Sequence, residues 1–151
     1  MDKHRRRGGF TLLELLLTLG LVVMLAGVSL GPALSGRLED KRLDSFVHSF
    51  ANDLRQARQL AISQSTPHVV QVRSNGYFLR REAYPILKTV KSVPWPAGIS
   101  ISTEHNDQGK DFVFGTMGLP KALSNNTVHF RNTRGTQRNV VVSAGGRIRI
   151  E

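Results

Sequence analysis

The N-terminal part of the chain holds an almost unbroken apolar run. It extends from Phe10 to Leu30, and Glu14 is the only ionisable side chain within these 21 residues. A helix of this length is roughly 31 Å long, enough to cross a bilayer core of about 30 Å. The pattern therefore predicts a transmembrane helix at residues 10–30.

A second apolar pattern follows between Arg37 and Gln64, where apolar residues recur at steps of three and four, as in an amphipathic helix. The recurring positions are Leu43, Phe46, Val47, Phe50, Leu54, Ala57 and Ala61. We assign residues 31–65 to this helix and expect a sheet of the same chain to cover its apolar face. Because proline favours a kink, Gly31-Pro32 predicts that the two helical stretches form one long bent rod.

After Pro67 the apolar period changes to two, which predicts β-strands throughout residues 66–151. The strand candidates are His68–Ser74, Tyr77–Glu82, Leu87–Val93, Ile99–Thr103, Asp111–Phe114, Thr127–Asn132, Asn139–Ser143 and Arg147–Ile150. Asn75-Gly76 predicts a hairpin turn, since both residues tolerate positive φ, and Gly145-Gly146 signals another turn. Trp95, which stands between two prolines, is expected to anchor the core or a sheet edge. The fold class is therefore α+β, with a long N-terminal helix packed on an antiparallel sheet or sandwich.

The charge of the chain is strongly positive, at a formal value of +10. From Val113 onward six basic residues face one acid, Glu151: they are Lys121, Arg131, Arg134, Arg138, Arg147 and Arg149. A basic C-terminal half favours an anionic partner such as nucleic acid, acidic lipid or polysaccharide, although a merely soluble surface has the same composition. The chain has no cysteine, which excludes a disulfide framework and a thiolate metal site.

A basic cluster precedes the apolar run: Lys3, Arg5, Arg6 and Arg7. It predicts that residues 1–9 stay in the cytoplasm while everything after Leu30 lies on the far side of the membrane. An ordinary secretory signal is the alternative, but its best cleavage site, Ala33-Leu34-Ser35-Gly36, is poor. Glu14 is costly inside a lone membrane helix. Either it stays hydrated at the interface, or it meets a positive group of a neighbouring subunit.

The heptapeptide Gly8-Gly9-Phe10-Thr11-Leu12-Leu13-Glu14, after its basic leader, resembles the class III signal of type IV pilins and type II secretion pseudopilins. The resemblance implies that a prepilin peptidase cuts after Gly9 and methylates Phe10. It also implies that Glu14 pairs with the N-terminus of an adjacent pilin subunit during assembly. The protein would then be a single-pass inner-membrane protein with a periplasmic C-terminal domain before it enters a pilus or pseudopilus.

The order of one long helix and about eight short strands is similar to the GspH/FimT branch of the pilin family. The Phe114-Gly115-Thr116-Met117-Gly118 turn and the final Gly-Arg strand carry this part of the resemblance. It implies the pilin fold, with residues 1–9 as a cleaved leader, 10–30 as the assembly helix, 31–65 as the helix of the globular domain and 66–151 as the β-rich domain.

Catalytic chemistry is not indicated. The five histidines are His4, His48, His68, His105 and His129, and no two stand at a metal-ligand spacing. No nucleophile with a base and no phosphate loop can be assembled. We therefore expect neither an enzyme nor a cofactor or metal.

The most informative motif of the soluble part is Gly145-Gly146-Arg147-Ile148-Arg149-Ile150. In a strand Arg147 and Arg149 point to the same side, about 7 Å apart, while the isoleucines face the core. Two guanidinium groups so placed can reach successive phosphates of nucleic acid, and Gly146 lets the chain turn. The alternative is an edge strand whose charges prevent edge-to-edge pairing.

More basic residues stand on the preceding hairpin, which we expect to be a neighbour of the last strand: Arg131, Arg134 and Arg138. The motif also resembles the Gly-Arg-x-Arg tail through which FimT-type minor pilins bind DNA in natural transformation. The leading hypothesis is a minor pilin that binds double-stranded DNA through its phosphate backbone at Arg147 and Arg149, with Gly146 shaping the turn and the hairpin arginines and Lys121 enlarging the patch. The alternative is a structural pseudopilin that primes a filament without binding DNA.

Overall fold

One helix and eight strands make up the computed structural model, which describes residues 10–83, 86–103, 110–121 and 126–151, with the backbone alone at 27–35. The helix α1 spans Leu12–Ser63. The strands are β1 His68–Arg73, β2 Gly76–Ala83, β3 Ile86–Pro94, β4 Ile99–Thr103, β5 Lys110–Phe114, β6 Asn126–Asn132, β7 Gln137–Val142 and β8 Ile148–Ile150. The predicted order is confirmed, with strand bounds within about two residues. The predicted leader, including Gly9, lies outside the described residues.

The chain forms two compact units, Met1–Leu38 and Glu39–Glu151. In the first unit, Thr11 caps the start of α1, because its Oγ1 accepts a hydrogen bond of 3.2 Å from the backbone N–H of Glu14. The described side chains of this unit up to Met24 and Leu25 are exposed, and most of them are apolar. Among the described residues, no helix is both long and apolar enough to cross a membrane.

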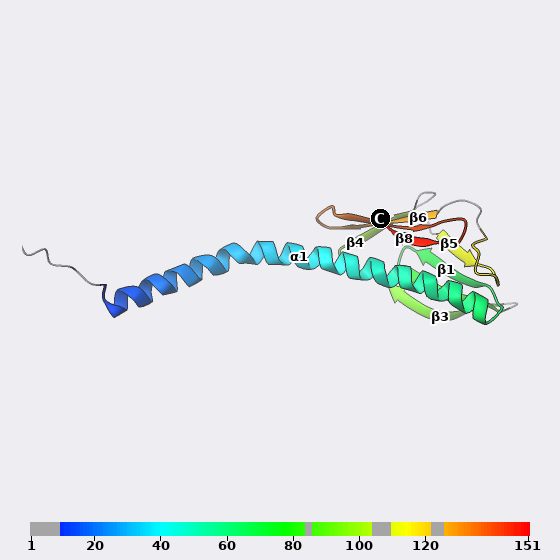
Figure 1. Cartoon of the computed structure of the whole chain (residues 1–151), viewed down its shortest axis with the longest axis horizontal. Helices are drawn as coiled ribbons and strands as arrows, with labels where there is room; N and C mark the ends of the chain where they lie inside the picture. Colours follow the sequence, from blue (N-terminus) through cyan, green and yellow to red (C-terminus); the bar gives the residue numbers. More distant parts are fainter. Residues whose placement is uncertain (1–9, 84–85, 104–109, 122–125) are drawn as a thin grey trace, which may run out of the picture. The chain divides into compact units, whose positions relative to one another are not determined.

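The second unit contains two antiparallel four-stranded sheets and the C-terminal half of α1. The strand orders are β3-β2-β1-β5 and β4-β6-β7-β8. Figure 1 shows this half of α1 alongside strands of both sheets. The apolar side chains predicted to face a sheet are buried there, and Phe46 alone among them is partly exposed. This arrangement is the expected α+β fold.

Aromatic side chains fill the part of the core between α1 and the sheets. Phe50 packs edge-on against Tyr77, at 4.9 Å between ring centroids, and against Phe130 at 5.2 Å. Trp95 packs against Tyr77 at 5.5 Å, and its Nε1 donates a 2.8 Å hydrogen bond to the carbonyl oxygen of Arg73. The prediction that Trp95 anchors the core is confirmed.

The first hairpin is present, but its turn differs from the prediction. Arg73 pairs with Gly76, so the loop consists of Ser74 and Asn75, and Ser65 is the only non-glycine among the described residues with positive φ. Gly76 is required for space instead, since a Cβ there would lie 2.4 Å from the carbonyl oxygen of Val93. The Asn-Gly pair therefore marks a close approach of β3.

A buried carboxylate ties α1 to the first sheet. The Tyr77 hydroxyl donates a 2.6 Å hydrogen bond to Asp53 Oδ2, and Lys91 Nζ lies 2.7 Å from Asp53 Oδ1. Burial raises the pKa of the Tyr77 phenol well above its usual value, and the bonded Asp53 carboxylate raises it further. Tyr77 therefore acts as a donor at all ordinary pH values.

Candidate nucleic-acid interface

The tail strand β8 separates its side chains as the alternation predicts. Ile148 is buried and Ile150 packs against the core, whereas Arg147 and Arg149 are exposed. Arg149 lies opposite Val141 of β7. Both arginines thus project from the same face of the β4-β6-β7-β8 sheet, which we call the outer face, and the opposite, core-facing side carries the isoleucines.

The turn that leads into β8 is held by the helix. Gly146 has φ of +78°, and its carbonyl oxygen accepts a 3.0 Å hydrogen bond from Nη1 of Arg58. One turn earlier on α1, Nη2 of Arg55 lies 3.4 Å from the carbonyl oxygen of Ile148. The two helix arginines therefore line the outer edge of β8, which is the last strand in the order of its sheet among the described residues.

Two glycine turns meet beside these arginines. A Cβ on Gly146 would lie 3.0 Å from the carbonyl oxygen of Gly118, and a Cβ on Gly118 would lie 2.6 Å from Cδ1 of Ile62. Both glycines have positive φ, so a side chain at either position would be strained in conformation as well as in space. The turn at 114–118 and the tail turn, both noted in the sequence, are thus parts of one structure on α1.

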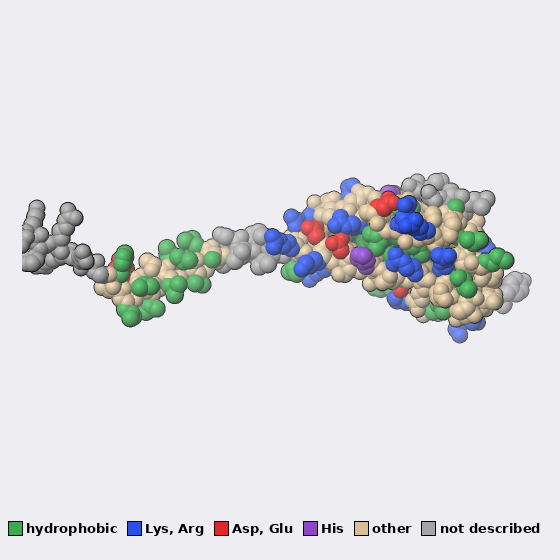
Figure 2. All heavy atoms as spheres, viewed as in Figure 1, with side chains coloured by type: hydrophobic (Ala, Val, Ile, Leu, Met, Phe, Trp, Pro, Cys, Tyr) green, Lys and Arg blue, Asp and Glu red, His purple; other side chains and the backbone are tan. Residues whose placement is uncertain are grey.

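Four arginines consequently surround β8: Arg55, Arg58, Arg147 and Arg149. We call this set the tail surface. Figure 2 shows Lys and Arg side chains gathered where α1 passes β8. Within the described residues, the carboxylate paired with this set is Glu151, whose Oε1 lies 3.5 Å from Nη2 of Arg149. The tail surface therefore keeps a clear excess of positive charge.

The arginines of the β6–β7 hairpin do not all lie on the face of the sheet that carries Arg147 and Arg149. Arg138 lies opposite Phe130, on the core-facing side of the sheet, and its Nε donates a 2.8 Å hydrogen bond to Asp44 of α1. Arg134, at the hairpin turn, lies 3.6 Å from Asp40 of α1. The sequence left the continuity of the basic patch open, and the expectation that Arg134 and Arg138 enlarge it is corrected here, because both side chains turn to helix carboxylates and away from the face that carries Arg147.

The same hairpin is fastened to α1 through Asp40. Its Oδ1 accepts hydrogen bonds of 2.8 Å from Thr136 Oγ1 and from Asn132 Nδ2. These bonds, first that of Thr136, lower the pKa of Asp40, and the positive charges of Arg134 and Arg138 act in the same direction. Arg134 and Arg138 thus help to hold the hairpin on α1.

Arg131 and Lys121 have different surroundings. Arg131 is exposed on the outer face, where its Nη2 donates a 3.2 Å hydrogen bond to Oε1 of Gln137. Lys121 Nζ lies 3.9 Å from Glu82 Oε2. Arg131 therefore shares a face with Arg147 and Arg149, whereas the charge of Lys121 is partly compensated.

Arg55 and Arg58 were not predicted as site residues. In the sequence they are polar positions of an amphipathic helix, where solvent exposure is the ordinary outcome. Their role depends on β8 lying beside α1, about 90 residues away in the chain. Their spacing of three residues, one helical turn, is the only local signal that they act together.

The predicted residues of the N-terminal segment have simple surroundings. Phe10 is exposed, and Glu14 is an exposed residue of the first turn of α1. Thr11 and Glu14 have the spacing of a capping box, and a carboxylate at this position also favours the positive end of the helix dipole. In the part of the chain that the structure describes, no group of three or more His, Asp or Glu could hold a metal ion.

Comparisons with known proteins agree with this architecture. Residues 47–146 match the family described as type II transport protein GspH, and residues 4–30 match the prokaryotic N-terminal methylation motif. The sequence matches no curated protein.

Among solved structures, the chain resembles the type IV minor pilin FimU of Pseudomonas aeruginosa, with a TM-score of 0.62, 19% identity and coverage of 75% of this chain and 90% of that one. It also resembles the minor pseudopilin EpsH from the type 2 secretion system of Vibrio cholerae, with a TM-score of 0.62, 12% identity and coverage of 72% and 95%. At identities this low, the structural similarity shows a shared fold alone.

Proposed function

Since the chain belongs to the family of type II transport protein GspH, we propose that this minor pilin or pseudopilin binds double-stranded DNA through its tail surface and promotes DNA uptake in natural transformation. The finer assignment is to a type IV pilus. Its partners would be other pilin subunits in the filament and DNA outside the cell.

The observation that carries the proposal is the arrangement of arginines around β8. Arg147 and Arg149 project from one face while Arg55 and Arg58 line the adjacent edge, and in the described part of the chain one carboxylate is paired with the four. Guanidinium groups bind phosphate oxygens in bidentate geometry. Because phosphates are the same in every sequence, the binding would be non-specific and strongly dependent on salt.

The N-terminal segment completes the proposal. Residues 1–9 would be a leader that a prepilin peptidase removes after Gly9, with methylation of Phe10, and Glu14 would pair with the N-terminus of a neighbouring subunit. The match of residues 4–30 to the methylation motif supports this processing. Residues 10–30 would hold the protein in the inner membrane in a single pass, with the C-terminal domain in the periplasm, until it enters the filament. The basic flank and the apolar run support this placement.

A purely structural filament subunit is the second candidate. The ion pairs of Arg134, Arg138 and Lys121 favour it, because they reduce the excess of positive charge that the sequence suggests. In this role the tail arginines would be solvated or would contact other subunits, and Glu14 would carry the function.

A salt-dependent titration separates the two candidates. The full-length protein in non-ionic detergent would be titrated against a fluorescent DNA duplex at 50 and 200 mM salt. Contacts with three to four phosphates predict an affinity that falls roughly 40- to 150-fold over this range. Feeble binding with little salt dependence would support the structural candidate. Tighter binding of an anionic polysaccharide at equal charge would identify a different ligand.

A further inference from the structure

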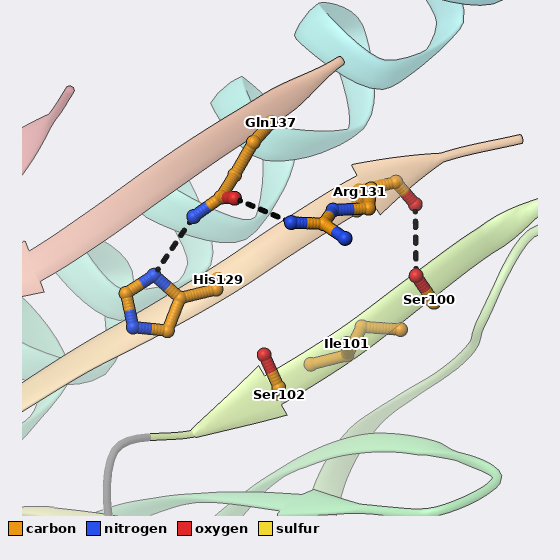
Figure 3. Close-up of a pocket in the computed structure, with 6 residues that line it drawn as sticks. All are labelled: Ser100, Ile101, Ser102, His129, Arg131 and Gln137. Carbon is orange, nitrogen blue, oxygen red and sulfur yellow. Dashed lines mark hydrogen bonds between the residues drawn. The ribbon is translucent and has the colours of Figure 1, made fainter. Parts of the chain in front are cut away.

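The outer face of the second sheet contains an open polar pocket at some distance from the tail. It has a volume of about 220 Å³ and is lined by Ser100, Ile101, Ser102, His129, Arg131 and Gln137. The side chains of Ser102, His129 and Arg131 lie around the open space over the paired strands β4 and β6 (Figure 3). No acidic residue is among the described residues that line it, so none of these compensates the charge of Arg131.

Gln137 contacts the side chains of both Arg131 and His129. Its Oε1 accepts a 3.2 Å hydrogen bond from Nη2 of Arg131, and its Nε2 lies 3.3 Å from Nδ1 of His129 (Figure 3). Nδ1 of His129 also lies 2.8 Å from Oδ1 of Asn139. Gln137 thus positions the guanidinium from one side, and no other described residue accepts a hydrogen bond from its N–H groups.

The hydroxyl groups of the pocket add donors of a second kind. Ser102 lies opposite His129 in the sheet and its hydroxyl points to the open space (Figure 3). Ser100 is already engaged, since its Oγ donates a 3.2 Å hydrogen bond to the carbonyl oxygen of Arg131. A guanidinium and a serine hydroxyl on one open space are donors suited to the oxygens of a phosphate group.

The distance from this pocket to the tail surface fits two contacts on one duplex. Arg131 of β6 pairs with Gln137 of β7, and Arg149 of β8 pairs with Val141 of β7. Val141 follows Gln137 by four residues, and β8 is two strands away from β6 in the sheet. At about 3.3 Å per residue and 4.8 Å per strand, the two Cα atoms are roughly 16 Å apart. A DNA major groove is about 12 Å wide, so phosphates on its two sides lie within reach of both arginines.

We propose that the pocket of Ser102, His129 and Arg131 is a phosphate-binding subsite that takes a second backbone phosphate of the duplex bound at the tail surface. The inference rests on the proposed function. The two contacts fix the direction of the duplex across the outer face, which a cluster around β8 alone does not.

The first test uses inorganic phosphate and does not require DNA. The ¹⁵N-labelled full-length protein in non-ionic detergent is titrated with phosphate at constant ionic strength, with chloride as the reference anion. We expect saturable chemical-shift changes at the Arg131 Nε–H and at the backbone N–H of Ser102. The change at Ser102 is lost in Arg131→Gln, and both changes are retained in Arg147→Gln/Arg149→Gln. Equal changes with chloride, or changes that survive Arg131→Gln, would overturn the subsite.

The second test asks whether Arg131 contacts a phosphate of the bound duplex. Arg131→Gln is expected to reduce the slope of log affinity against log salt by about 0.9, the effect of one phosphate contact. Lys88→Gln, on exposed β3 of the other sheet, removes the same charge and should leave the slope unchanged. Equal slopes in both variants would overturn the duplex contact. Phosphate binding at the pocket without any duplex binding by the wild type would overturn the proposed DNA function and leave a site for free phosphate.

Discussion

Nη1 of Arg58 donates a hydrogen bond of 3.0 Å to the carbonyl oxygen of Gly146, 88 residues away in the chain. This bond joins the C-terminal half of α1 to the turn from which the tail strand begins. The carbonyl is available because Gly146 adopts φ of +78° against the backbone of Gly118. The position of Arg147 and Arg149 is therefore set by α1 as well as by β7.

Replacing Arg58 tests this link. Arg58→Gln removes a charge-assisted hydrogen bond at the tail turn, so we expect the free energy of unfolding to fall by about 1–2 kcal/mol. Duplex affinity should fall as well, because the turn that places Arg147 loosens. Urea unfolding and duplex titration measure the two effects.

The matched control is Arg55→Gln, which removes the same charge from α1 but a longer bond of 3.4 Å. It should reduce affinity through charge alone and alter stability less. Identical stability for Arg58→Gln and the wild type would contradict the role of Arg58 in holding the turn.

The two glycines of the tail turn form a second matched pair. Gly146→Ala forces a Cβ to 3.0 Å from the Gly118 carbonyl at a positive φ, and we expect a loss of about 1–2 kcal/mol or more in stability. Gly145→Ala has no atom within 4 Å of the added Cβ and should be nearly neutral. Thermal unfolding of both variants checks this, and a more harmful Gly145→Ala would contradict the turn geometry.

The attachment of the hairpin to α1 predicts a response to acid. The hydrogen bonds of Thr136 and Asn132 lower the pKa of Asp40 below its ordinary value of 3.8, so the folded state prefers the carboxylate. The resulting stability is present above about pH 4 and is lost as the pH falls through the lowered pKa of the folded state.

Unfolding curves between pH 5 and pH 2 measure this loss in the wild type and two variants. Asp40→Asn should remove the part of the acid-induced loss of stability that comes from the Asp40 carboxyl. Thr136→Val should reduce this part, since the hydrogen bond from Thr136 is the largest cause of the lowered pKa of Asp40. An unchanged acid profile in Asp40→Asn would contradict the assignment.

The buried carboxylate between α1 and the first sheet predicts a large effect on stability and none on DNA. Asp53→Ala leaves the Tyr77 hydroxyl without its acceptor and Lys91 without its ion pair, so we expect a loss of about 2–4 kcal/mol. Tyr77→Phe should cost about 1–1.5 kcal/mol, because a hydrogen bond is lost but the ring remains. A folded Asp53→Ala should bind duplex as the wild type does; weaker binding would contradict the location of the site at the tail surface.

Much of the fold could be predicted from the sequence because its determinants are local. The three- and four-residue recurrence from Leu43 to Ala61 marks the buried face of α1, and alternation marks the strands. The alternation of apolar and polar residues along β6 also predicts that Arg131 and Phe130 lie on opposite faces of the sheet.

The direction of Arg138 could not be predicted in this way. Val140, Val141 and Val142 are all apolar, so the pattern in β7 does not say which residues face the core. The acceptors on α1 that decide the matter, Asp40 and Asp44, are about 94 residues away in the chain. The contribution of Arg55 and Arg58 escaped prediction for the same reason, because it arises from the packing of β8 against α1.

We expect DNA to bind at the tail surface and not at Arg134 and Arg138, and a comparison of two double variants distinguishes these places. Arg147→Gln/Arg149→Gln and Arg134→Gln/Arg138→Gln remove the same charge, but the second pair lies next to helix carboxylates. In a salt series of duplex titrations, we expect the tail variant to lose affinity roughly tenfold or more and about 1.8 units of salt slope, while the hairpin variant stays close to the wild type. Equal losses in the two variants, or no duplex binding by the wild type, would contradict this expectation.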